Sequence, residues 1–161
     1  DTETELFGQG NMAPRIACFS FAWRDGSRVE TALMNYTDGA AALSEQLDRC
    51  IAGEIVIAGH YLPYDVLVSG AQDVGLLLKF FDAYALGRVH CTQVAEWLND
   101  TATGTLRSEW NEEAGEYKLN KSYALENLAC IHLGQACSKD EWRMRYGELR
   151  YTSFALWPAR A

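Results

Sequence analysis

The dipeptide Asp25-Gly26 constrains the fold most, because it lies between two segments with the pattern of β-strands. In residues 15–23, every second side chain falls on one face of an extended chain, and that face is apolar: Ala17, Phe19, Phe21, Trp23. Residues 28–34 follow the dipeptide as a returning strand. Asp-Gly between two such segments is the strongest short-range signal for a hairpin turn. We therefore predict an antiparallel hairpin over residues 15–34.

A helix and a short apolar segment follow the predicted hairpin. The helix is expected to begin with Asp38 as its N-terminal cap and to end at Gly53, and its apolar residues recur at helical spacing: Leu43, Leu47, Cys50, Ile51. Residues 54–58 form a run rich in Ile and Val, which is typical of a strand buried on both faces. This succession predicts an α/β fold with a mixed sheet flanked by helices.

The second half of the chain is predicted to be mainly helical. We expect one or two helices over residues 65–85 with a break near 73–75, a brief strand at 88–91, and a helix over 92–100 capped by Thr92. Residues 101–120 are polar and aperiodic, which predicts a loop or a mobile hairpin. A helix over 122–133 should end at Gly134, and a capping box at 138–141 should open another. Their inward residues are predicted to be Leu125, Leu128, Ala129 and His132 in the first, and Trp142, Tyr146 and Leu149 in the second.

The composition is that of one globular domain. The chain has 161 residues, of which 48% are hydrophobic, and no apolar run approaches the ~20 residues of a membrane-spanning helix. The five cysteines are an odd number at irregular spacing, which favours reduced, buried thiols and a cytoplasmic location over a disulfide framework. The net charge of -8 argues against a free-standing duplex-DNA-binding protein, but not against an enzyme whose carboxylates hold divalent cations.

Carboxylates in two segments are the best candidates for a chemical site. Asp1 and Glu3 fall on the same face if residues 1–3 are extended, and paired carboxylate oxygens suit a hard cation such as Mg²⁺ or Mn²⁺. Asp65 follows the predicted buried strand, at the end of the sheet where α/β proteins bind their ligands. Two other interpretations remain open: Asp1 and Glu3 as a solvated terminus, and Asp65 as a helix cap beside a core Tyr64.

Together these segments resemble a known family. Asp-x-Glu opens the chain, the predicted hairpin and helix follow, and a turn at residues 59–65 ends in Tyr64-Asp65. The later segments that match in order are residues 123–129, Leu133-Gly134, residues 138–149 and Trp157-Pro158. This succession resembles the DEDD-type 3′–5′ exonucleases and is similar to the proofreading exonuclease domain of bacteriophage DNA polymerases related to family A. The resemblance implies a ribonuclease H-like domain over residues 1–161, with a truncated first strand and incomplete at both ends.

The resemblance also implies roles for individual residues. Two Mg²⁺ or Mn²⁺ ions would be held by Asp1, which bridges them, by Glu3 near the attacking water, and by Asp65 at the other ion. The residues implied to seat the terminal nucleotide are Thr2, Thr4, Leu6, Phe7 and Tyr64. Leu6 and Phe7 are equally consistent with loop residues that cover the edge of the core.

The chain departs from the family pattern at two points. Tyr61 stands where the second motif usually has an asparagine. The third motif needs a tyrosine or histidine followed four or five residues later by an aspartate, and residues 149–161 contain no acidic residue. We expect that motif just beyond Ala161, so the chain would lack the fourth carboxylate. The α-amino group of Asp1, partly protonated near neutral pH, would compete with a cation for the Asp1 carboxylate, so we also expect weaker metal binding and lower stability than in a longer chain.

The function implied is metal-dependent 3′–5′ exonuclease activity at single-stranded or frayed DNA 3′ ends. The chain would be the proofreading part of a longer phage-type DNA polymerase, with the polymerase domain in the same polypeptide. Two alternatives remain open, a 3′–5′ exoribonuclease and a catalytically inactive module that binds nucleic acid or a partner.

Overall fold

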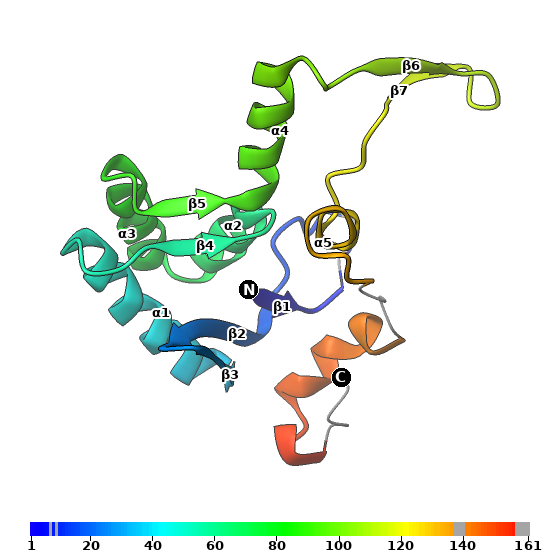
Figure 1. Ribbon diagram of the computed structural model, residues 1–161. Coiled ribbons are helices and arrows are strands. Elements are labelled where there is room, and N and C mark those ends of the chain that lie inside the picture. The colour runs from blue at the N-terminus through cyan, green and yellow to red at the C-terminus, as the bar shows by residue number, and fades with distance from the viewer. Residues whose placement is uncertain (7, 9, 137–140, 157–161) are drawn as a thin grey trace. The chain divides into compact units, whose positions relative to one another are not determined.

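The computed structural model describes residues 1–6, 8, 10–136 and 141–156 (Figure 1). The described residues divide into two compact units, the first made of those within 1–90 together with 141–156, and the second of residues 91–136. The class is mixed α/β with small antiparallel and parallel sheets, which confirms the predicted class. The ribonuclease H-like arrangement and the single domain over residues 1–161 stay predictions. Phe7, Cys137 and most of the predicted capping box lie outside the described residues.

The predicted hairpin is present in the first unit. Strands β1 (Thr2–Thr4), β2 (Ile16–Asp25) and β3 (Arg28–Asn35) form an antiparallel sheet in the order β1-β2-β3. Asp25 pairs with Arg28 across the turn, where Gly26 has φ +59°, a left-handed conformation that glycine adopts without steric cost. On the other side of β2, Glu3 of β1 lies opposite Cys18. The sheet therefore starts at the candidate carboxylates.

Helix α1 (Tyr36–Ile51) begins earlier than predicted. Its N-terminal cap is Asn35, whose side-chain oxygen accepts a hydrogen bond from the Asp38 N–H at 3.0 Å and whose amide donates to Asp38 Oδ2 at 2.7 Å. The prediction of Asp38 as the cap was wrong because β3 runs on to Asn35, where the chain leaves the sheet. The predicted apolar face is confirmed at its buried members, Leu43, Leu47 and Cys50, and Gly53 follows the helix end with φ +81°.

The predicted buried strand over residues 54–58 is shorter and more exposed than expected. Strand β4 (Ile57–Gly59) pairs with β5 (Val89–Cys91) in a separate two-stranded sheet, and Figure 1 shows the two running in the same direction. Val56, just before the ladder, is 51% exposed. Burial on both faces was therefore wrong, because Val56 and Ala58, which share one face of the extended chain, are exposed, whereas Ile55 and Ile57 on the other face are half-buried.

The break predicted near residues 73–75 is confirmed. Helix α2 (Leu62–Gln72) ends and helix α3 (Val74–Ala85) begins at Asp73, whose Oδ1 accepts a hydrogen bond from the Gly75 N–H at 2.8 Å. The 3₁₀ helices η1 (Glu141–Arg150) and η2 (Phe154–Leu156) complete the first unit. Leu149 is buried against Ala17 and Cys18, and Tyr146 packs at the same place, as predicted, whereas the side chain of Trp142 lies outside the part that the structure describes.

The second unit contains helix α4 (Thr92–Thr103), strands β6 (Ser108–Asn111) and β7 (Glu116–Leu119), and helix α5 (Leu125–Leu133). Of the two alternatives for residues 101–120, the hairpin is present. Thr92 is not the cap of α4, since the strand β5 ends at Cys91 and Thr92 is already helical. In α5, Leu128 and Ala129 are buried and Gly134 ends the helix, as predicted, but Leu125 and His132 are exposed.

The cysteines follow the prediction in part. Cys18 and Cys50 are buried free thiols, Cys91 is half-buried, and Cys130 is exposed because it lies one residue beyond the buried face of α5. No helix among the described residues is long and apolar enough to cross a membrane.

Candidate functional site

The opening strand and the first turn of α2 meet at Asp65. This carboxylate is 5% exposed, and its Oδ1 accepts hydrogen bonds from the backbone N–H and from the hydroxyl of Thr2, both at 2.7 Å. Asp65 lies in the first helical turn, where the helix dipole favours a negative charge. The cap position is Tyr61, so the interpretation of Asp65 as the N-terminal cap is wrong. Two segments 63 residues apart in sequence are thus joined through one buried carboxylate.

Asp1 reaches the same place. Its Oδ1 accepts a hydrogen bond from the Thr2 N–H at 3.0 Å, so a single amide donates to both Asp1 and Asp65. The backbone of Asp1 is held on β2, because its terminal ammonium donates to the Ser20 oxygen at 2.8 Å and its own oxygen accepts from the Ser20 N–H. The hydrogen bonds that the structure gives the two carboxylates all end on Oδ1. The structure therefore brings two of the three predicted metal ligands together.

Glu3 is half-buried on β1, opposite Cys18. Burial raises the pKa of the Cys18 thiol to about 12, and the negative charge of Glu3 adds to this effect. The thiol therefore stays protonated and unreactive. In the described part of the chain, no three His, Cys, Asp or Glu side chains are grouped so as to hold a metal ion. Glu3 is thus not gathered with Asp1 and Asp65 into such a group.

A second contact joins the same segments at the neighbouring residue of α2, Tyr64. The Tyr64 hydroxyl is 2.7 Å from Thr4 Oγ1. Burial raises the pKa of Tyr64, the hydrogen bond with Thr4 opposes this, and the charges of Asp65 and Glu3 raise it further. The phenol is therefore neutral near pH 7, with one proton to share. Thr2 and Thr4, predicted to seat a nucleotide, both use their hydroxyls to bind α2.

The remaining predicted site residues differ in exposure. Leu6, two residues after the end of β1, is 59% exposed, whereas Phe7 lies outside the described residues. Tyr61 has φ +55°, the left-handed conformation in which asparagine is favoured over other residues with side chains. The tyrosine there carries backbone strain.

The donor set has the chemistry of a hard-cation site. Asp1, Glu3 and Asp65 offer only carboxylate oxygens, which Mg²⁺ and Mn²⁺ prefer. Asp65 Oδ2 receives no hydrogen bond from the described residues, although the residue is buried, so this oxygen has capacity for a ligand. The residues present fit a divalent cation in donor type and in the proximity of Asp1 to Asp65. Glu3 would have to move toward these two carboxylates to join them in binding a cation.

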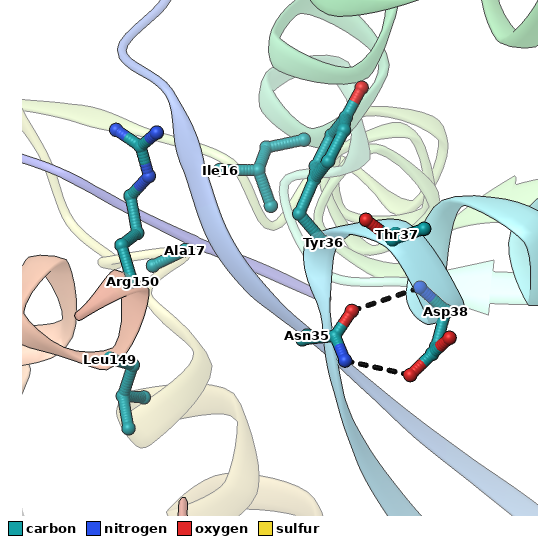
Figure 2. A pocket seen from close by; sticks show the side chains of 8 residues that line it. All are labelled: Ile16, Ala17, Asn35, Tyr36, Thr37, Asp38, Leu149 and Arg150. Atoms are coloured by element: carbon teal, nitrogen blue, oxygen red, sulfur yellow. Dashed lines mark hydrogen bonds between the residues drawn. The ribbon is translucent and has the colours of Figure 1, made fainter. Parts of the chain in front are cut away.

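A pocket of about 390 Å³ in the first unit is a separate candidate (Figure 2). It lies between the start of β2, the N-terminus of α1 and the end of η1. Figure 2 shows Asn35 and Asp38 bonded to each other, and Arg150 forms an ion pair with Glu5. The charged groups that line the pocket are therefore partnered within the chain, and we assign it no ligand.

The second unit contains a charged cluster that the sequence did not predict. Lys121 binds both Glu96 and Asp100 of α4, the latter at 2.8 Å, and the Tyr123 hydroxyl donates to Asp100 at 2.9 Å. His132 of α5 lies 3.0 Å from Glu96. The pKa values of Glu96 and Asp100 are lowered, chiefly by their hydrogen bonds from Lys121. Only the i, i+4 spacing of the two acids was visible in the sequence, and the lysine that they share lies more than twenty residues away.

This cluster has a structural role. Each charge has an opposite partner, and the contacts join α4 to the segment between β7 and α5 and to α5 itself.

Comparison of the chain with protein-family models, with curated proteins and with solved structures finds no match. The geometry of the candidate site and the order of the motifs along the chain are therefore the two observations that bear on its function.

Proposed function

We propose that this chain is a metal-dependent 3′–5′ exonuclease unit that hydrolyses phosphodiester bonds at DNA 3′ ends and serves as the proofreading part of a longer DNA polymerase. The observation that carries the proposal is that the Asp65 carboxylate accepts hydrogen bonds from the N–H and the hydroxyl of Thr2, and that the Asp1 carboxylate accepts a hydrogen bond from the same N–H. A site of this kind needs acidic side chains from the opening strand and from the second motif at one place. The order of the motifs along the sequence supports the same assignment.

The chain's own residues would position the carboxylates. Thr2 holds Asp65 with two donors, and the Tyr64 hydroxyl bonds Thr4, so α2 is tied to β1 at two points. Asp1, Glu3 and Asp65 would hold the cations. The chemistry supplied by two bound Mg²⁺ or Mn²⁺ ions is activation of a water and stabilisation of the leaving 3′ oxygen. Leu6, exposed beside β1, would contact the terminal base.

The test pairs a binding measurement with an activity measurement. Mn²⁺ is titrated calorimetrically into the chain, and release of the labelled 3′ nucleotide from single-stranded DNA is followed in the same buffer. We expect Asp65→Asn to lower both Mn²⁺ affinity and nucleotide release by about 10²-fold or more. The matched control is Asp73→Asn, which also removes one carboxylate of the first unit but keeps a residue that caps α3. Equal losses in the two variants would contradict the proposal.

A second candidate is a module that binds nucleic acid or a partner without catalysis. It is favoured by one observation, that the described residues contain no group of three metal-ligating side chains. For such a module, single-strand binding is unchanged by Asp65→Asn and indifferent to Mg²⁺. For the exonuclease, binding of the 3′ end strengthens when Mn²⁺ or Ca²⁺ is added and loses that dependence in Asp65→Asn.

A further inference from the structure

The β6–β7 hairpin of the second unit has two chemically different faces. Residues directly opposite each other on antiparallel strands share a face, and the register pairs Trp110 with Tyr117 and Ser108 with Leu119. The two rings pack edge to face with centroids 5.1 Å apart. The other face carries Glu109 opposite Lys118 and Asn111 opposite Glu116. One face of the hairpin is therefore aromatic and apolar, and the other is polar.

The aromatic face is uncovered. Trp110 is 55% exposed, Tyr117 is 71% exposed and Leu119 is 48% exposed. The sheet has only these two strands, so in the part of the chain described each strand has an outer edge without a neighbouring strand. Figure 1 shows the hairpin extending away from α4. An isolated two-stranded hairpin is only marginally stable in water, and packing against its apolar face stabilises it.

The charges of the hairpin indicate what covers this face. The hairpin, residues 108–119, contains four glutamates and one basic residue, Lys118, which forms an ion pair with Glu116, and Glu112 and Glu113 at the turn are exposed. The chain offers an internal comparison, the β2–β3 hairpin, which also has an exposed tryptophan, Trp23. Its tip, residues 24–30, carries two acidic and two basic residues. The negative charge is thus specific to β6–β7, and it disfavours a phosphate backbone there.

We propose that the β6–β7 hairpin is a docking surface for a basic segment of a partner protein. Arginine or lysine side chains of an extended segment would stack on Trp110 and Tyr117, since aromatic faces attract cations. Others would pair with Glu112 and Glu113 at the turn, and the open strand edges would accept the segment's backbone. This proposal is independent of the exonuclease assignment, because it involves neither Asp65 nor the opening strand.

The test uses the whole chain and a short labelled peptide in which arginine alternates with threonine, with binding followed by fluorescence anisotropy. We expect the double variant Trp110→Ala/Tyr117→Ala to bind the peptide about tenfold more weakly. Glu112→Gln/Glu113→Gln should weaken binding severalfold and reduce its dependence on NaCl. The matched control Trp23→Ala should bind as the unchanged chain does. Circular dichroism melting verifies that the variants fold.

Three outcomes would overturn the proposal. One is peptide binding that falls equally in Trp23→Ala and in the hairpin variants. Another is tight binding of labelled oligothymidylate that is lost in Trp110→Ala/Tyr117→Ala, which would make the aromatic face a nucleic-acid surface. The third is concentration-dependent dimerisation abolished by the same variant, which would make a second copy of the chain the occupant.

Discussion

Replacement of Thr2 by valine tests whether the opening strand and α2 are joined as the structure describes. Valine keeps the shape of threonine and its preference for strands, but loses the hydroxyl that donates to Asp65 Oδ1 at 2.7 Å. The backbone N–H of Thr2 remains as the second donor. The change therefore removes one of the two hydrogen bonds to a buried carboxylate and leaves the other in place.

The expected cost follows from burial and charge. Thr2 and Asp65 are 6% and 5% exposed, so solvent does not replace the lost donor. A hydrogen bond to a charged group contributes about 1.5–3 kcal/mol to stability. Thr2→Val should therefore lower the free energy of unfolding by about 2 kcal/mol, which corresponds to a fall in Tm of about 4–8 °C for a chain of this length.

The assay is urea denaturation followed by circular dichroism, with a double-mutant cycle that combines Thr2→Val and Asp65→Ala. The control is Thr31→Val on β3, where the threonine is exposed, and it should change stability by less than about 0.5 kcal/mol. A coupling energy between positions 2 and 65 below about 0.5 kcal/mol would refute the reasoning. So would an equal loss of stability in Thr31→Val.

Three further predictions concern strain, packing and pH. Tyr61→Asn should raise stability by about 1 kcal/mol, since asparagine tolerates the left-handed φ of +55° better than tyrosine; thermal melting measures the gain, and a lower Tm would contradict it. Gly39→Ala should cost about 1–3 kcal/mol in urea denaturation, because the added Cβ would lie 2.8 Å from Cβ and Cγ of the buried Phe19, and a neutral result would show that the core yields there. Glu96 and Asp100 have lowered pKa values, so their stabilisation of the second unit is complete above their ordinary values of 4.5 and 3.8 and is lost as the pH falls through the lowered values. The protection factors of the α4 amides, which correct the observed exchange for its intrinsic rate at each pH, should fall over that acid range, and protection that is unchanged with pH would exclude the linkage.

Turns and helix faces were predictable because they depend on neighbouring residues. Asp25-Gly26 is sufficient to specify the β2–β3 turn, since Gly26 takes the left-handed conformation at no cost. The spacing of Leu43 and Leu47 specifies which face of α1 is buried, whatever it packs against. Asp73 stops one helix and caps the next through its own side chain. The turn, the buried helix face and the helix boundary therefore follow from local chemistry alone.

Burial, partners and the site required the tertiary structure. Ile and Val in residues 54–58 predict a strand, but whether the face that carries Val56 is covered depends on the packing of chain far away in sequence, and Val56 is 51% exposed. The motif order led to Asp65, whereas its two donors on Thr2 are a contact across 63 residues that no periodicity encodes. Lys121 between Glu96 and Asp100 is a further example. Local preferences act over one turn or one hairpin, while these contacts exist only once separate segments have packed together.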